Sequence, residues 1–325
     1  MALLKVDRLR VEFPTRQRTL VAVDDVSLSL DAGEVLGVVG ESGAGKSVTG
    51  AAIIGLIEPP GRIAGGEIRF AGRRIDCLPD DAKRRIRGRE IGSVFQDPLT
   101  SLNPLFTVGQ QLVETILAHS DRSAADARRH AVRLLGDVGI PAPAQRIDAY
   151  PHEFSGGMRQ RVVIALAICA TPRLIIADEP TTALDVSIQS QIIALLKRLC
   201  RDHGTAIMLI THDMGVIAET ADRVAVMYAG RIVEVGHVRQ ILRSPNHPYT
   251  RGLMESIPRL DSDSARLAQI DGTMPRLHEI PVGCAFHPRC PDASDRCREN
   301  RPALRMVDDP AAVACLLFDD GRADD

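Results

Sequence analysis

Hydrophobic and polar positions in the first 240 residues alternate between the period of a strand and the period of a helix. Residues 21–30 show the strand period, with valine and leucine on one face and serine on the other. Residues 185–199 show the helix period, with isoleucine and leucine along one stripe. Other short runs are predominantly apolar, as expected for strands buried on both faces of a parallel sheet. These runs are residues 35–39, 91–95, 174–177 and 206–210.

The remaining elements complete an α/β fold. Residues 3–13, 21–30 and 67–70 predict strands of an antiparallel β layer on the N-terminal side of the parallel core sheet. Residues 80–89 predict an exposed basic helix, and residues 224–228 and 231–235 predict a hairpin. Two further helices are inserted between strands and predict a helical subdomain of about residues 97–160. These helices are residues 108–119 and 124–139.

The regular pattern fades from about residue 244, where proline, histidine, aspartate and arginine become frequent. We therefore place a boundary near residue 240. Residues 1–240 are expected to form one domain, and residues 241–325 an irregular extension that carries a group of cysteines.

Composition narrows the class of protein. The chain has 325 residues, 45% of them hydrophobic, which is ordinary for a globular protein of this size. The net charge is −2, so no overall positive field favours nucleic acid as a partner. No apolar run approaches the roughly 20 residues that span a bilayer, and the N-terminus lacks the layout of a signal peptide. We expect the chain to remain in the cytoplasm.

Residues 40–47 carry the clearest chemical signal. They read Gly-Glu-Ser-Gly-Ala-Gly-Lys-Ser, between an apolar strand and an alanine-rich helix, which is the pattern of a phosphate-binding loop. Glycines allow successive N–H groups to point at an anion, and the helix adds its positive dipole end. Lys46 is expected on the β- and γ-phosphates, and the Ser47 hydroxyl on Mg²⁺. The expected nucleotide contacts are Gly40, Ser42, Gly43, Ala44, Gly45, Lys46, Ser47 and Val48.

Other polar residues end apolar strands, and one polar segment opens a helix. In an open parallel sheet such residues gather at the carboxyl edge, where ligands bind. Asp178 is expected to hold Mg²⁺, together with Gln96, and Glu179 to orient or deprotonate an attacking water. His212 is a candidate partner of the γ-phosphate, and Phe13 a candidate for stacking on adenine.

Each of these residues also has an ordinary structural interpretation when taken alone. Asp178 and Glu179 could cap the next element, and Gln96 could be a polar turn residue. A lone histidine such as His212 is more often structural, and a phenylalanine in a strand, such as Phe13, is usually part of the core. The phosphate loop upstream favours the catalytic interpretation of the set.

The order of these motifs resembles the nucleotide-binding subunit of an ABC transporter, a phosphate-loop NTPase, over roughly residues 1–240. The resemblance rests on the phosphate loop, Gln96, the Ser-Gly-Gly-Met-Arg-Gln segment at residues 155–160, Asp178 and Glu179, Ala183-Leu184-Asp185, and His212. It implies ATP hydrolysis with Mg²⁺ and two subunits that face each other head to tail. Residues of the helix-opening segment would then contact the γ-phosphate on the partner's loop, namely Ser155, Gly156, Gly157 and Gln160. The family often has leucine and glutamine where Phe154 and Met158 stand, which leaves the polar contacts unchanged.

Residues 95–104, 153–161 and 247–250 are similar to the ATPases of dipeptide and oligopeptide importers. The resemblance is closest to the subunit type that has a cysteine-rich tail and pairs with a second, related ABC ATPase. It implies two membrane permease subunits, an extracytoplasmic substrate-binding protein, and a peripheral position on the cytoplasmic face of the inner membrane. Nickel and glutathione importers share much of this pattern, so the solute stays open.

Cys284, Cys290, Cys297 and Cys315 have five, six and seventeen residues between successive members. This spacing is loose for a structural zinc site, where two to four residues usually separate a pair. Four thiolates suit a [4Fe–4S] cluster as well as zinc in ligand type. Resemblance to related importer subunits favours the iron–sulfur cluster, and zinc and free thiols remain alternatives.

Two other classes of function compete with transport. ABC ATPases of DNA repair or translation usually carry long coiled coils, zinc modules or two ATPase halves, and this sequence has one half and no heptad arm. A nucleotide-binding regulatory module without turnover is disfavoured by Asp178, Glu179 and His212.

Overall fold

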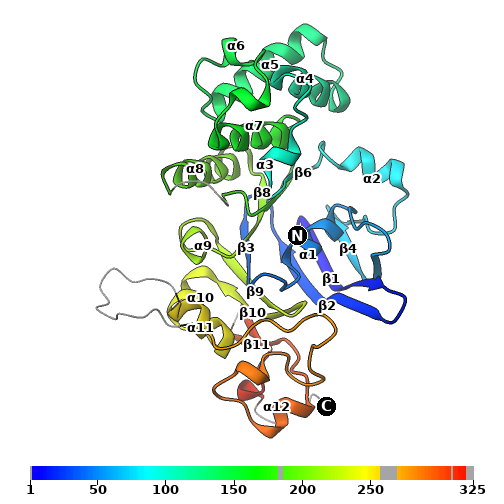
Figure 1. Cartoon of the computed structure of the whole chain (residues 1–325), viewed down its shortest axis with the longest axis vertical. Coiled ribbons are helices and arrows are strands. Elements are labelled where there is room, and N and C mark those ends of the chain that lie inside the picture. The colour runs from blue at the N-terminus through cyan, green and yellow to red at the C-terminus, as the bar shows by residue number, and fades with distance from the viewer. Residues whose placement is uncertain (1, 182–185, 257–268, 309, 320–325) are drawn as a thin grey trace. The chain divides into compact units, whose positions relative to one another are not determined.

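The computed structural model describes residues 2–181, 186–256, 269–308 and 310–319. The chain forms two compact units. The first comprises Met1–Leu30, Leu36–Asp76 and Ile210–Asp325, and the second comprises Asp31–Val35 and Cys77–Leu209. Residues 40–47 and the cysteine-rich extension therefore belong to one unit, and the inserted helices to the other (Figure 1).

The first unit contains the predicted antiparallel layer. Its strands β1 (Leu4–Pro14), β2 (Thr19–Leu30), β4 (Arg62–Phe70) and β5 (Arg73–Arg74) pair in the order β2-β1-β4-β5. Strand β4 begins earlier than residue 67, where the sequence pattern starts. Its first half still pairs with β1, but it contains two glycines, which give no alternating apolar pattern.

The same unit holds the strand that leads into the phosphate loop. Strand β3 (Val35–Val39), buried along its length, pairs in parallel with β9 (Arg223–Tyr228). Strand β9 continues into β10 (Arg231–His237), as the predicted hairpin. Helix α1 (Lys46–Ile53) starts at the end of the loop that follows β3.

The C-terminal extension packs onto this first unit. Strand β12 (Ala311–Val313) pairs with β10, and β11 (Arg305–Asp308) pairs with β12. Glu234 of β10 is fully buried, and its carboxylate accepts hydrogen bonds from the backbone N–H groups of Asn246 (2.7 Å) and His247 (3.0 Å). Residues on both sides of residue 240 therefore pack together in one unit. The helices of this region are α9 (Met214–Thr220), α10 (Val238–Arg243), α11 (Pro248–Glu255), η2 (His287–Arg289), α12 (Asp295–Glu299) and η3 (Leu316–Phe318).

The second unit combines three apolar strands with the inserted helices. Strands β6 (Ile91–Val94), β7 (Leu174–Asp178) and β8 (Ala206–Thr211) lie in the order β8-β7-β6, and β6 pairs with β7 in parallel. Helix α2 (Asp80–Ile86) is shorter than predicted because Arg87 is extended and Gly88 has a positive φ of 75°. The other helices are α3 (Pro98–Ser101), α4 (Val108–His119), α5 (Ala124–Asp137), α6 (Pro143–Arg146), η1 (Pro151–Glu153), α7 (Gly156–Ile168) and α8 (Val186–His203).

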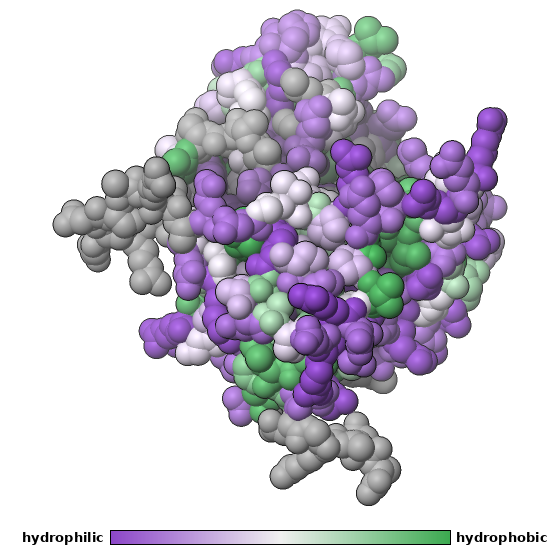
Figure 2. Space-filling view, turned by 60° about the horizontal axis from the view of Figure 1, so that its bottom comes forward, coloured by the Kyte–Doolittle hydropathy of each residue, from purple (hydrophilic) through white to green (hydrophobic). Residues whose placement is uncertain are grey.

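The predicted α/β class, antiparallel β layer and helical insertion are confirmed. Among the described residues, no helix is long and apolar enough to cross a membrane. On the face drawn in Figure 2, hydrophilic residues dominate and apolar residues gather in small separate groups.

Helix α4 begins with a reciprocal capping arrangement. The Thr107 hydroxyl accepts a hydrogen bond from the Gln110 backbone N–H (3.2 Å), and the Gln110 side chain accepts one from the Thr107 N–H (2.8 Å). Such a cap satisfies N–H groups that have no partner inside the helix.

Thr107→Ala is expected to lower the free energy of local unfolding of α4 by about 1 kcal/mol, because it removes this cap. Hydrogen exchange of the α4 amides measures the change. The control is Thr115→Ala within the same helix, where the hydroxyl only bonds back to the Gln111 carbonyl (2.8 Å). Equal protection in the two variants would contradict the capping role.

Candidate functional site

The phosphate loop is wrapped tightly against neighbouring backbone in the first unit. Gly45 has a φ of 98° and caps α1, and a Cβ placed there would lie 2.8 Å from the Ala22 carbonyl oxygen. The Ala44 carbonyl accepts a hydrogen bond from the Gly230 N–H at 2.9 Å. Only glycine fits at position 45, so the local fold explains this part of the motif.

Lys46 points into the loop. Its side chain is buried, and Nζ donates to the carbonyl oxygens of Gly40 (2.7 Å) and Glu41 (3.1 Å). Ser42 and Ser47 are exposed on the same loop. A closely wound loop with a central ammonium group and a helix N-terminus fits the phosphates of a nucleotide.

Two further candidates lie in the first unit. His212 is exposed and follows the last residue of β8, and the next residue, Asp213, caps α9 by accepting from the Gly215 N–H (2.8 Å). Phe13 lies in β1, half-buried, with its ring against the backbone at Gly61, where an added Cβ would be 2.5 Å from Phe13 Cε1. The roles predicted for His212 and Phe13 from the sequence stay predictions.

The second unit brings Gln96 and Glu179 together. Gln96 follows β6 and Glu179 follows β7, and these parallel strands are neighbours, so their carboxyl ends meet at one edge. Gln96 Nε2 donates to Glu179 Oε2 at 3.1 Å. Asp178, the last residue of β7, is half-buried beside Glu179 in the chain.

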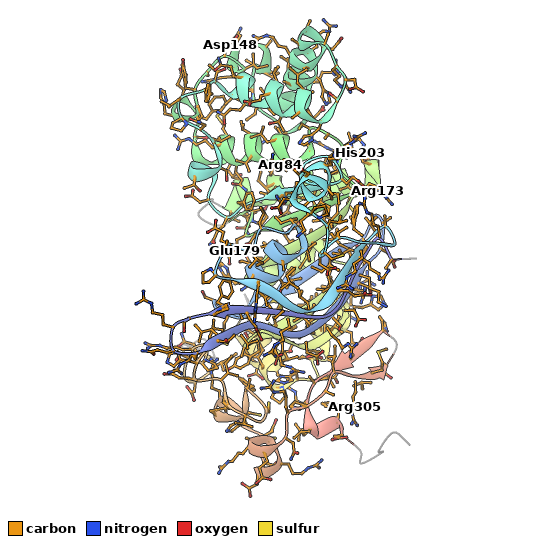
Figure 3. The ribbon with its side chains drawn as sticks, turned by 90° about the vertical axis from the view of Figure 1, so that its right-hand side faces the viewer. Arg84, Asp148, Arg173, Glu179, His203 and Arg305 are labelled. Carbon is orange, nitrogen blue, oxygen red and sulfur yellow. The ribbon has the colours of Figure 1, made fainter. Side chains whose placement is uncertain are left out.

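Glu179 also has an unusual backbone conformation. Its φ is 47°, in the left-handed region that costs a residue with a side chain roughly 1–3 kcal/mol. Figure 3 labels this residue, at the end of a strand where its side chain is only partly covered. Backbone strain of this kind concentrates at functional sites, and the sequence pattern carries no signal of it.

The segment at residues 155–160 forms the start of α7. The Ser155 hydroxyl caps the helix by accepting from the Met158 N–H at 3.4 Å. A Cβ placed on Gly156 would meet no atom within 4 Å, whereas one on Gly157 would lie 2.8 Å from Ile188. Gln160 is 2% exposed, and its Nε2 has no hydrogen-bond partner among the residues that the structure describes. The predicted motif Ala183-Leu184-Asp185 lies outside the described residues.

Two residues that hold the phosphate loop, Tyr249 and Arg289, were not predicted from the sequence. The Glu41 N–H donates to Tyr249 Oη at 2.8 Å, and the Glu41 carboxylate accepts from Arg289 Nη1 (2.9 Å) and Nη2 (3.0 Å). Arg289 is 248 positions away from Glu41, so no local spacing could reveal the pair. The available signal was Glu41 itself, the acidic residue inside an anion-binding motif.

The four clustered cysteines lie close together in the extension. All are half-buried, and the Cys284 N–H donates to the Cys297 carbonyl at 2.8 Å. Burial raises the pKa of Cys290 to about 11, with a contribution from Cys284 and Cys315. Burial also raises the pKa values of Cys284 and Cys315, and the nearby Cys297 thiol contributes to both increases. Within the described ranges, no three His, Cys, Asp or Glu side chains converge on a point where they could share one metal ion.

Comparison with known proteins identifies the family of the chain. A family described as ABC transporter matches residues 23–182, and one described as Oligopeptide/dipeptide transporter, C-terminal region, matches residues 233–297. The chain is 48% identical over 324 residues to the dipeptide transport ATP-binding protein DppD of Escherichia coli (strain K12), covering 99% of each chain. The chain belongs to the ATP-binding subunits of the dipeptide and oligopeptide ABC transporter family.

Other members and a solved structure agree. The ABC ATPase described here is 49% identical over 314 residues to the oligopeptide transport ATP-binding protein OppD of Salmonella typhimurium (strain LT2), covering 97% of this chain and 93% of that one. A dimeric, post-hydrolysis structure of the ATP-binding cassette MJ0796 bound to ADP and Pi matches with a TM-score of 0.66 and 28% identity. That match covers 73% of this chain and 99% of that chain. The predicted family and ATPase activity are thus confirmed.

Gly45→Ala is expected to weaken nucleotide binding at least tenfold and to destabilise the protein by more than about 2 kcal/mol, because the new Cβ meets the Ala22 carbonyl. The matched control is Gly72→Ala, which also has a positive φ (79°) but no atom within 4 Å of the new Cβ. It is expected to lose only about 1 kcal/mol of stability and to retain nucleotide binding. Titration with a fluorescent ATP analogue and thermal unfolding measure both effects. Equal behaviour of the two variants would show that the close packing at Gly45 is unimportant.

Proposed function

We propose that this chain hydrolyses ATP to power the import of dipeptides or oligopeptides delivered by an extracytoplasmic binding protein. The observation that carries the proposal is that its likeness to dipeptide and oligopeptide transport ATP-binding proteins runs along almost the whole chain, extension included. Nickel, glutathione or another small solute is the alternative cargo, since such importers share much of the motif pattern.

The proposed chemistry assigns a role to each predicted residue. The N–H groups of residues 40–47 and the Lys46 ammonium bind the phosphates, and Phe13 stacks on adenine. Bound Mg²⁺ neutralises charge on the phosphate oxygens. The residues of this chain proposed to hold the ion are Ser47, Gln96 and Asp178.

Glu179 is the proposed general base. Its carboxylate accepts a proton from the attacking water, and the 3.1 Å hydrogen bond from Gln96 orients it. His212, exposed at a strand end, is assigned to hydrogen-bond the γ-phosphate.

The proposed catalytic assembly contains two ATPase subunits, this chain and a second, related one. Ser155, Gly156 and Gly157 would contact the γ-phosphate held by the partner's loop, and Gln160 is proposed to contribute to the same site. The open space around Gly156 and the N-terminus of the 13-residue helix α7 support this, because both leave backbone N–H groups accessible to an anion.

Exposed apolar side chains support docking of the second unit on a membrane permease. Leu105 is 79% exposed, Phe95 49% and Phe106 47%, and all lie beside Gln96 or in the segment leading to α4. Exposed large apolar groups often mark interaction sites. We therefore propose that these side chains contact a permease. From the resemblance to importer ATPases we further propose two permease subunits and a peripheral position of this chain on the cytoplasmic face of the inner membrane.

We also propose that Cys284, Cys290, Cys297 and Cys315 hold a [4Fe–4S] cluster. In such a cluster each thiolate binds a different iron, so the sulfurs need not meet at one point as they would around zinc. The mutual influence of the thiols on their pKa values supports their proximity. Because burial raises the pKa values of Cys284, Cys290 and Cys315, cluster assembly would release protons from these three thiols and be favoured at higher pH.

Reconstitution with the permease tests the transport function. Peptide with its binding protein is expected to stimulate ATP hydrolysis. Glu179→Gln should leave ATP binding within about twofold of wild type and lower turnover by at least about 100-fold, because the base is lost. Steady-state ATPase assays and nucleotide titration measure these quantities. Stimulation by nickel or glutathione but not by peptides would favour the alternative cargo, and unchanged turnover in Glu179→Gln would refute the base.

Iron and labile-sulfide analysis of anaerobically prepared protein tests the cluster. We expect about four of each per chain, and loss of both in Cys284→Ser. The matched control is Cys77→Ser, which changes an exposed cysteine outside the extension and should leave the iron content unchanged. Stoichiometric zinc without sulfide would refute the cluster.

A further inference from the structure

Glu41 of the phosphate loop is held by the C-terminal extension at two points. Its backbone N–H donates to the hydroxyl of Tyr249, a fully buried residue of α11. Its carboxylate accepts hydrogen bonds from both terminal nitrogens of Arg289, a residue of η2, in a bidentate pair at 2.9 and 3.0 Å. Its carbonyl accepts from Lys46, the residue assigned to the phosphates. The extension therefore contacts the loop at a residue that also contacts its key lysine.

Arg289 makes several hydrogen bonds within the extension. Its side chain is 7% exposed, and Nε donates to the Asp271 carbonyl at 2.8 Å. Nη2 also reaches the carbonyls of Ile270 (3.3 Å) and Gly272 (3.4 Å). These contacts leave the guanidinium little freedom, so it presents a fixed fork to Glu41.

Aromatic rings enclose the same guanidinium. Its Cζ lies 5.9 Å from the ring centroids of both Tyr228 and Phe286, and Nη1 is 3.4 Å from Tyr228 Oη. Burial lowers the pKa of Arg289, but hydrogen bonds to Glu41 and Tyr228 and the negative charge of Glu41 outweigh burial and raise the pKa above its ordinary value. The arginine side of the ion pair is thus shielded from water. Removing the Glu41 carboxylate would leave the Arg289 charge buried and uncompensated.

A second segment of the extension lies over the loop. A Cβ placed on Gly43 would be 3.9 Å from Met274 Cγ. Arg289 also directly precedes Cys290, so the backbone that carries the cysteines carries the guanidinium. The extension therefore contacts the phosphate loop at both Glu41 and Gly43.

We propose that Arg289 is a positioning residue for the phosphate loop. By holding the Glu41 carboxylate it fixes the loop in the form that binds nucleotide, so the C-terminal extension controls the affinity of the protein for ATP. This inference rests on the nucleotide-binding role proposed for residues 40–47.

The test measures the Kd of the full-length chain for a fluorescent ATP analogue with Mg²⁺. Glu41→Gln and Arg289→Met are each expected to raise Kd about tenfold, since each removes a charge-assisted pair that fixes the loop. The double variant should bind no more weakly than the single ones, because both changes remove the same pair. Arg289→Lys should restore about a third of the lost affinity on a logarithmic scale, because it keeps charge without the fork.

Hydrolysis in the reconstituted complex provides a second measure. The KM for ATP should rise in Arg289→Met with kcat within about twofold of wild type, because the lost interaction positions the substrate and does not perform the chemistry. The matched control is Arg305→Met, which breaks the ion pair with Asp319 (2.6 Å) elsewhere in the extension and should leave Kd within about twofold. Figure 3 labels Arg305.

The proposal is overturned if Arg289→Met raises Kd equally in the wild-type and Glu41→Gln backgrounds, or if both single variants bind like wild type. If Arg289→Met does not fold, Glu41→Gln decides alone, because it keeps the side-chain volume and removes only the charge. Lys46→Ala distinguishes failure of the proposed nucleotide site from failure of the role proposed for Arg289. Unchanged nucleotide binding in Lys46→Ala would refute the site itself, whatever the result for Arg289.

Discussion

A loop that binds phosphate must turn its backbone N–H groups inward around a buried ammonium group. In this protein the requirement is met by close packing. Gly45 lies against the Ala22 carbonyl, Ala44 is tied to Gly230, and Lys46 bonds to the carbonyls of its own loop. Strands β2 and β3, together with the turn after β9, therefore hold the loop in its shape. The rest of the first unit supports these strands.

The second unit places polar groups at strand ends, including the residues proposed to act in catalysis. Adjacent parallel strands bring Gln96 and Glu179 into hydrogen-bonding contact, and the left-handed backbone at Glu179 directs its side chain. Ser155 then starts α7 with an open approach at Gly156. Rigid elements thus carry the polar groups, and short connections aim them.

Local chemistry explains how much the sequence revealed. Buried strands such as Val35–Val39 and amphipathic helices such as Val108–His119 have short-range patterns, and the structure places them where the pattern does. The loop at residues 40–47 was equally legible because its glycines and lysine are contiguous. The first half of β4 was not predicted, because its glycines interrupt the alternating apolar pattern. The left-handed backbone at Glu179 was not predicted either, because backbone strain has no sequence pattern.

Long-range pairing was beyond such reasoning. Periodicity ends near residue 244, which suggested a separate appendage, but Glu234 binds the backbone of residues 246 and 247, and β12 pairs with β10. Nothing in the local sequence around Cys290 indicates that the preceding arginine reaches residue 41. Contacts of this kind depend on how the whole chain folds back on itself.

The hydrogen bond from the Glu41 N–H to Tyr249 has a practical consequence for defining the protein's working parts. A shortened chain ending near residue 240 would contain every recognised nucleotide motif and still lack the hydroxyl that this N–H requires. The boundary drawn by motifs and the boundary drawn by cooperative packing therefore differ. Chimaeras between related subunits should exchange the loop and the tail as one block.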